Sequence, residues 1–87
     1  PKFYFYVLQS QRTGKYYKGH CQDLQSRVKE HNSGRTKSTK HGIPWILVYS
    51  EEFPSRASAI HREQESKTYL GGRELLKILR QLSSKED

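Results

Sequence analysis

A run of six strand-forming residues near the start of the chain constrains the fold more than any other segment. Phe3-Tyr4-Phe5-Tyr6-Val7-Leu8 places apolar or aromatic side chains on both faces of an extended strand. A strand of this kind needs cover on both faces. We therefore expect it to lie inside a sheet.

The next segments predict two further strands. Thr13-Gly14 is a turn signal, and residues 16–21 then form the return strand of a hairpin. Gly19 within that strand marks a bulge or a place where another group approaches the backbone. A third strand is expected at residues 45–49, after Pro44, and its continuous apolar run favours a buried position.

A first helix is expected at about residues 22–33. Asp23 lies where an N-terminal carboxylate is favoured, and Gly34 lies where a left-handed C-terminal cap is wanted. Leu24 and Val28, four residues apart, give this helix an apolar stripe.

Two more helices are expected after the third strand. Ser55 is a plausible N-cap for a helix that runs to about residue 69, and Gly71-Gly72 should end it. The last helix should cover about residues 73–83. Its apolar stripe consists of Leu75, Leu76, Leu79 and Leu82.

This order of elements predicts an α+β fold, in which a small three-stranded antiparallel sheet is flanked by three helices. Eighty-seven residues suit one domain with a modest core, at about residues 3–82, followed by a polar tail at 83–87. A compact monomer is the default expectation. Strand edges and the leucine stripe could instead support a dimer.

Several classes of protein are disfavoured by composition. No apolar run approaches the roughly 18–20 residues that a membrane span needs. The single Cys21 cannot form an internal disulfide and suits a reducing compartment, so we expect a cytoplasmic protein. Paired zinc-ligand spacing, a phosphate-binding glycine loop and a serine nucleophile motif are all missing.

The excess positive charge is concentrated in the first part of the chain. The net charge is +7, and residues 1–40 carry nine Lys and Arg against two Asp and Glu, whereas residues 41–87 carry seven of each. One basic face would attract a polyphosphate backbone. Ordinary solubility charge spread around the fold is the alternative.

Arg27 and His31 are four residues apart and share one stripe of the first helix. A permanent cation and an imidazole in this arrangement can present two donors to an anion. The alternative is a solvated helix face.

Glu63 falls on the expected inner face of the second helix, where a carboxylate is costly unless it is paired or bound to metal. That face is marked by Ala59, Ile60, Lys67 and Leu70. We expect Glu63 to have either a cation partner, such as Arg27 or Arg62, or a metal ion.

Six tyrosines are present, and four lie in the expected hairpin. A phenol can act as a general base or a hydrogen-bond relay, although aromatic residues in strands usually pack in the core. Strand alternation alone leaves open whether Tyr16 or Tyr17 faces a site.

Taken together, these residues resemble the GIY-YIG endonuclease domain, above all the small standalone bacterial proteins related to the nuclease domain of the excision-repair C subunit. Tyr4-Phe5-Tyr6 stands where the family has Gly-Ile-Tyr, and Tyr17-Lys18-Gly19 stands where it has Tyr-Ile-Gly, with ten residues between them. Arg27 follows Tyr17 by ten residues, and His31 follows by four more. His61-Arg62-Glu63 matches the segment whose Glu binds the metal.

The resemblance covers about residues 3–80, including the loop from Arg35 to Trp45. Tyr4 replaces the first glycine of the family pattern. Lys18 replaces an apolar residue, so it must point outward, lie along the surface or add a phosphate contact. The C-terminal Asn of some relatives has no clear match.

The resemblance implies a DNA endonuclease that hydrolyses phosphodiester bonds with one Mg²⁺ or Mn²⁺ ion. Glu63 would hold the metal, and Arg27 would stabilise the charge on the phosphate. Tyr17, or else Tyr6, would accept the proton of the attacking water, and His31 would orient or polarise a tyrosine or that water. The roles of these last three residues are interchangeable on sequence alone.

The resemblance also implies that basic residues hold the DNA backbone, which gives affinity without sequence specificity. These residues are Lys15, Lys18, Arg35, Lys37 and Lys40. The expected partner is DNA, branched or damaged, in a setting of DNA repair, with no membrane and no small-molecule cofactor. One alternative is a nucleic-acid-binding module that does not cleave. Another is a nuclease that needs a partner protein for targeting.

Overall fold

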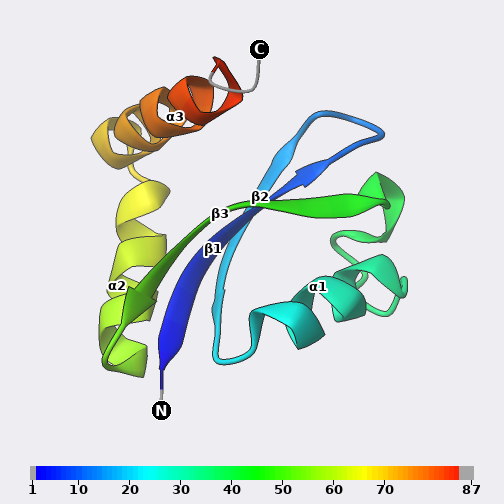
Figure 1. Ribbon diagram of the computed structural model, residues 1–87, viewed down its shortest axis with the longest axis horizontal. Coiled ribbons are helices and arrows are strands. Elements are labelled where there is room, and N and C mark those ends of the chain that lie inside the picture. Colours follow the sequence, from blue (N-terminus) through cyan, green and yellow to red (C-terminus); the bar gives the residue numbers. More distant parts are fainter. Residues whose placement is uncertain (1, 85–87) are drawn as a thin grey trace.

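The central element of the structure, a computed structural model that describes residues 2–84, is a three-stranded antiparallel sheet (Figure 1). Its strands are β1 (Phe3–Ser10), β2 (Tyr16–Cys21) and β3 (Trp45–Phe53), in the spatial order β2-β1-β3. Phe5 to Leu8 are each no more than 2% exposed. The prediction of an interior first strand is therefore confirmed.

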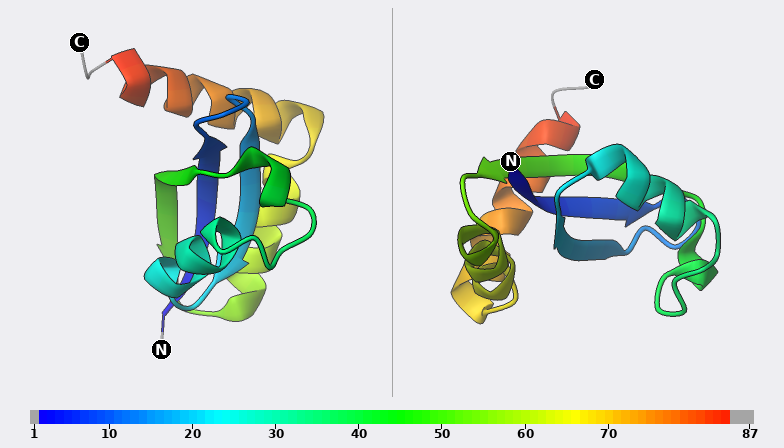
Figure 2. Two further views of the ribbon diagram at one scale, coloured as in Figure 1. Left: turned by 90° about the vertical axis from the view of Figure 1, so that its right-hand side faces the viewer. Right: turned by 90° about the horizontal axis from the view of Figure 1, so that it is seen from below.

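The helices are α1 (Leu24–Asn32), α2 (Arg56–Ser66) and α3 (Tyr69–Ser84), with a short 3-10 helix, η1 (Lys40–Gly42), before β3. The predicted α+β class and the element order are confirmed. Helix α1 packs on one face of the sheet, whereas α2 and α3 lie against the other (Figure 2). None of the helices within residues 2–84 is long and apolar enough to cross a membrane.

Each face of β1 belongs to a different part of the core, because successive side chains of a strand point to opposite faces. Phe5 and Val7 pack with Leu75 and Leu79 of α3. The opposite face of β1 forms a second cluster beneath α1. That cluster consists of Tyr6, Leu8, Cys21 and Trp45, with Leu24 and Val28 against it.

The caps of α1 and α2 follow the sequence signals. Asp23 accepts a hydrogen bond from the backbone N–H of Ser26 at 3.1 Å, and Gly34 has a φ of +82°. Ser55 accepts from the backbone N–H of Ser58 at 3.1 Å. These local interactions fix where both helices begin and where α1 ends.

The third strand differs from its prediction. It continues to Phe53 and lies at the edge of the sheet, where Ile46 and Leu47 are each 41% exposed. A sheet of three strands has only one interior position, and β1 takes it. Glu51 stays within the strand and binds Arg62 of α2 at 2.8 Å.

The break between α2 and α3 was predicted at Gly71-Gly72, and this was wrong. Helix α2 ends at Ser66, and α3 begins at Tyr69 and includes both glycines. A Cβ on Gly71 would overlap the carbonyl oxygen of Glu65, so glycine here permits a tight junction between the helices.

The predicted inner faces of these helices are only partly correct. Ala59 of α2 is buried, but Lys67 and Leu70 are exposed. In α3, Leu75 and Leu79 are buried, whereas Leu76 and Leu82 remain about 40% exposed. The predicted polar tail lies mostly outside the described residues.

Candidate active site

The candidate site is built around β2, the second edge strand of the sheet. Seen from below, β2 lies between α2 on one side and the loop of residues 33–44 on the other (Figure 2). Lys18 and His20 contact α2, whereas Tyr17 and Cys21 belong to the cluster beneath α1. Groups from both faces of the sheet can therefore meet at this edge.

Gly19 has no side chain, and this leaves room for the Tyr6 hydroxyl against the β2 backbone. Tyr6 is the antiparallel partner of Gly19, and a Cβ on Gly19 would lie 2.6 Å from the Tyr6 hydroxyl oxygen. The phenol thus lies directly against the β2 backbone. The prediction that another group approaches Gly19 closely is confirmed.

The Tyr6 hydroxyl starts a buried chain of polar groups. Its oxygen lies 3.1 Å from Nε2 of His31, and Nδ1 of His31 lies 2.8 Å from Oγ1 of Thr39. His31 and Thr39 are each 1% exposed. This chain runs from the interior strand β1 through α1 to the loop before β3.

Both titratable members of this chain are neutral near pH 7. Burial, with a smaller effect from Arg27, lowers the pKa of His31, although Glu30 opposes the shift. Burial and the neighbouring Tyr17 raise the pKa of Tyr6. A neutral imidazole and a protonated phenol in contact form a pair that can transfer a proton.

His31 is not a second surface donor beside Arg27. The expectation that the two side chains together present donors to an anion is therefore corrected. Residues four apart differ by about 40° around a helix. In α1 this difference leaves His31 buried and Arg27 partly exposed. The Arg27 side chain is 42% exposed and lies 3.3 Å from Glu30. His31 instead lies in the interior, where it contacts the Tyr6 hydroxyl.

Tyr17, and not Tyr16, belongs to this site. Its ring centroid lies 4.8 Å from that of His31, 6.3 Å from that of Tyr6 and 6.3 Å from that of Trp45. Tyr16 is exposed on the other face of the sheet. Tyr17 therefore packs in the core and also lies beside the candidate site.

Glu63 has two hydrogen-bond partners, a lysine and a histidine, and neither is an arginine. Its Oε1 lies 2.7 Å from Nδ1 of His20, and its Oε2 lies 2.7 Å from Nζ of Lys67. Arg62 instead binds Glu51 and Glu65. The expectation of a partner for Glu63 is confirmed, whereas Arg27 and Arg62 were the wrong partners.

The Glu63 carboxylate is ionised. Burial acts to raise its pKa, but the hydrogen bonds from Lys67 and His20 outweigh burial and bring the pKa below its usual value. The side chain is 18% exposed. An ionised oxygen donor is therefore held in place and still reaches solvent.

Tyr6 connects the two sides of the site. Arg27 comes from α1 and Glu63 from α2, on opposite faces of the sheet. Both charges act on the Tyr6 hydroxyl: Arg27 lowers its pKa, and Glu63 raises it. Of the five residues singled out from the sequence, Tyr6, Tyr17 and His31 are in mutual contact, whereas Arg27 and Glu63 lie on opposite faces of the sheet and make their own contacts, with Glu30 and with His20 and Lys67.

A single divalent metal ion fits Glu63. Within residues 2–84, no group of three or more His, Cys, Asp and Glu side chains could hold a metal ion. Mg²⁺, however, usually binds through one or two carboxylates and keeps several waters. Each oxygen of Glu63 retains a lone pair beside its present hydrogen bond, and the Lys67 partner is exposed enough to move aside.

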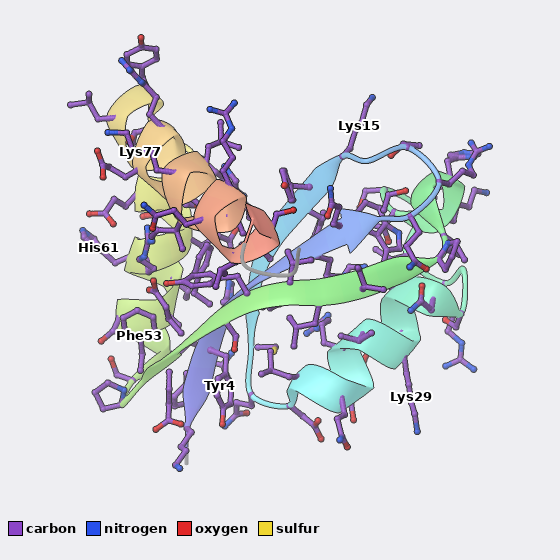
Figure 3. All side chains as sticks on the ribbon, turned by 45° about the horizontal axis from the view of Figure 1, so that its top comes forward. Tyr4, Lys15, Lys29, Phe53, His61 and Lys77 are labelled. Carbon is purple, nitrogen blue, oxygen red and sulfur yellow. The ribbon has the colours of Figure 1, made fainter. Side chains whose placement is uncertain are left out.

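Four of the five predicted backbone-binding residues are exposed cations: Lys15, Arg35, Lys37 and Lys40. Lys15 points away from the hairpin (Figure 3). The hairpin is tied to the neighbouring loop, because Arg12 donates to the carbonyl of His41 at 2.7 Å and Ser10 donates to that of Gly42 at 2.6 Å. These bonds hold the hairpin, which carries Lys15, against the end of the loop that carries the other three cations.

Lys18 differs from these four. Its ammonium donates to the carbonyl oxygen of Ser66 at 2.8 Å, at the C-terminal end of α2. Burial, together with Lys67 and Arg62, lowers its pKa. The side chain thus lies along the protein surface, and this geometry gives no support to a phosphate contact.

Sequence reasoning missed His20 and Thr39. Strand alternation from Gly19 places His20 on the Lys18 face, but the sequence carries no signal that Glu63 would meet it there. Thr39 lies in a polar loop without periodicity, and its contact with His31 follows only from the folded path of that loop.

Comparison with known proteins gives consistent matches. A family model described as the GIY-YIG catalytic domain matches residues 2–71. A UPF0213 protein of Staphylococcus saprophyticus is 38% identical over 69 residues, which cover 78% of this chain and 83% of that protein. A UPF0213 protein of Staphylococcus aureus is 42% identical over 57 residues, which cover 64% of this chain and 70% of that protein.

A solved structure shows the same architecture. The solution NMR structure of a UPF0213 protein from Bacillus halodurans superposes with a TM-score of 0.53 at 31% identity, and the match covers 90% of this chain and 85% of that chain. The family model spans every element that contributes a residue to the candidate site, from β1 to α2.

Proposed function

The chain belongs to the GIY-YIG family, with UPF0213 proteins among its relatives, and from this membership and the site geometry we propose that it is a metal-dependent DNA endonuclease. One observation carries the proposal. The Tyr6 hydroxyl lies against Gly19 and contacts His31, and Glu63 is held at the same strand β2 by His20. This arrangement supports a site in which Tyr6 would be the proton acceptor, Arg27 the cation and Glu63 the metal ligand.

Tyr6 and His31 together would remove the proton from the attacking water. A phenol with a raised pKa is an unsuitable base if it must first ionise alone. In contact with a neutral imidazole, Tyr6 can take the water proton while its own proton passes to Nε2 of His31. The positive charge then rests on His31, and no phenolate needs to form.

Tyr17 is the alternative acceptor of this proton. Its ring lies 4.8 Å from that of His31, and no hydrogen bond joins the two side chains among the described contacts. We assign Tyr17 to positioning the water or the phosphate. The contact with His31 favours Tyr6 as the acceptor.

Charge on the phosphate would be balanced from both faces of the sheet. Arg27 would donate to the phosphate oxygens on which negative charge builds. Glu63 would hold Mg²⁺ or Mn²⁺, which supplies Lewis-acid stabilisation when bound. His20 and Lys67 would keep the carboxylate in position.

The exposed cations near the hairpin and the loop of residues 33–44 would bind the DNA backbone. They are Lys15, Arg35, Lys37 and Lys40. Such contacts carry no sequence information. The proposed substrates are therefore defined by DNA structure, and branched and damaged duplexes, in a role in DNA repair, are the forms to compare first.

A second candidate is a module that binds nucleic acid without cutting it. The observation in its favour is that both oxygens of Glu63 already have hydrogen-bond partners, His20 and Lys67. The carboxylate is therefore satisfied in the absence of metal. The same basic surface would serve this function.

Cleavage of supercoiled and branched DNA with Mg²⁺ or Mn²⁺ separates the two candidates. We expect metal-dependent nicking that falls by about 100-fold or more in Glu63→Ala and in Arg27→Ala. Glu65→Ala and Lys29→Ala change exposed residues of the same two helices and should retain activity.

Tight binding without nicking on any substrate would support the second candidate. Nicking that survives Glu63→Ala would contradict the proposed role of that residue.

A further inference from the structure

Thr39 holds a fixed position beside His31. Its backbone N–H donates to Thr36 at 3.1 Å, and its carbonyl accepts from Nε1 of Trp45 at 2.7 Å and from the N–H of Gly42 at 3.0 Å. The residue is 1% exposed. Its backbone is thus held by contacts that do not involve the hydroxyl.

The hydrogen atoms of the buried chain can be counted. Tyr6, neutral His31 and Thr39 each contribute one proton. If the imidazole proton is on Nδ1, it points to Thr39, the Thr39 hydroxyl donates to the carbonyl of Thr36 at 3.4 Å, and Tyr6 donates to Nε2. All three protons then have acceptors.

The other tautomer satisfies fewer groups. A proton on Nε2 would point to the Tyr6 oxygen, and Thr39 would donate to Nδ1. The Tyr6 proton would then have no acceptor among the hydrogen bonds of the described residues, and Tyr6 is only 2% exposed. An unmatched buried donor is costly, so the Nδ1–H form is favoured.

We propose that Thr39 is a positioning residue: its hydroxyl accepts the Nδ1 proton of His31 and, together with the Tyr6 hydroxyl that donates to Nε2, holds the ring in its Nδ1–H tautomer. The consequence for catalysis rests on the proposed function, whereas the tautomer does not. With a proton on Nε2, Tyr6 could not pass its own proton to His31. Thr39 also lies between Lys37 and Lys40, so the loop proposed to bind DNA also orients the imidazole.

The test compares Thr39→Val, which removes the hydroxyl at nearly constant volume, with Thr39→Ser, which keeps it. ¹⁵N NMR of the histidine ring nitrogens, at a pH where His31 is neutral, reports the tautomer. We expect an Nδ1–H ring for His31 in the wild type and in Thr39→Ser. In Thr39→Val a large fraction should move to Nε2–H, while the exposed His61 ring stays unchanged as an internal control.

Cleavage assays give the second readout. We expect kcat of Thr39→Val to fall by about 10- to 100-fold, the range seen when a partner that orients a ligating imidazole is lost. KM for DNA should stay near the wild-type value, and Thr39→Ser should restore kcat.

An Nε2–H ring in the wild type would overturn the proposal, even if the valine variant failed to fold. An unchanged tautomer in a folded Thr39→Val protein would also overturn it. Because the ring-nitrogen spectrum needs no substrate, it decides the role of Thr39 even if the protein cuts no DNA.

Discussion

Gly19 shows how one missing side chain positions a reactive group. Because a Cβ there would lie 2.6 Å from the Tyr6 hydroxyl oxygen, Gly19→Ala should displace the phenol and break its contact with His31. We expect the free energy of unfolding to fall by about 1–3 kcal/mol, as for other overpacked sites, and DNA cleavage to be lost. Urea unfolding and nicking assays measure the two effects.

The control for this prediction is the double variant Gly19→Ala/Tyr6→Leu. With the aromatic ring removed, the added methyl group has room, so the cost of Gly19→Ala should shrink in this background. Equal costs in the two backgrounds would show that Tyr6 is not the group that requires glycine at this position.

His31 predicts a pH dependence of stability. Burial lowers its pKa in the folded state, so the unfolded chain binds a proton more readily. Stability from this group is therefore fully present above the unfolded value of about 6.5 and is lost as pH falls through it. Urea unfolding between about pH 5 and 8 measures the slope.

His31→Gln should remove most of that slope. The lowered pKa values of Glu51 and Glu63 act in a lower window, because those carboxylates lose their contribution only as pH falls below their usual value of about 4.3. An unchanged slope in the glutamine variant would assign the effect to another group.

At this scale the sequence identified the groups but not their partners. Arg27, His31 and Glu63 were singled out from residue types and spacing, and Tyr6 and Tyr17 from the resemblance to the GIY-YIG domain. Thr39 and His20 were not, because each meets its partner only after folding; His20 and Glu63 are 43 positions apart. The burial of His31 also depends on which side of α1 faces the sheet.

At the level of helices and strands, some sequence patterns predict a single position in the fold and others fit two. An interior strand at residues 3–8 followed from its two apolar faces. Residues 45–49 look equally apolar, yet β3 lies at an edge, because burial depends on how many strands the sheet has. Gly71 gives the signal of a helix end but instead permits the close approach of α2 and α3.

Two lysines predicted to bind DNA, Lys18 and Lys37, should behave differently, because only Lys18 takes part in the β2–α2 contact. Lys37 is exposed in the loop, so Lys37→Ala should weaken DNA binding and reduce the salt slope by about 1. Lys18 donates to Ser66, so Lys18→Ala should lower the free energy of unfolding by about 1 kcal/mol and leave the slope unchanged. Fluorescence anisotropy of a labelled duplex at several salt concentrations, with urea unfolding, checks both.

If Lys18→Ala reduced the salt dependence of DNA binding as much as Lys37→Ala does, Lys18 would have to be a phosphate contact after all. An unchanged slope in Lys37→Ala would remove the loop from the proposed DNA surface.

In the whole molecule, the strand order decides what the site can contain. The order β2-β1-β3 leaves β2 at one edge, where α2 contacts it through the Glu63–His20 hydrogen bond. Helix α1 packs on the opposite face, over β1 and β3, and reaches Tyr17 of β2 through the His31 side chain (Figures 1 and 2). Arg27 and Glu63 belong to different layers, and both shift the pKa of Tyr6 in addition to the larger effect of burial. Sequence spacing could not show this, because it contains no information on which edge each helix reaches.

The central claim is that a divalent metal held by Glu63 lies at the β2 edge, close to Tyr6. The most direct test is line broadening of backbone amide NMR signals by substoichiometric Mn²⁺. We predict that Gly19, His20 and Glu63 broaden first, that Glu63→Gln abolishes the effect, and that Glu65→Gln retains it. Broadening centred on other carboxylates, such as Glu52 or Glu74, or broadening that survives Glu63→Gln, would contradict the account.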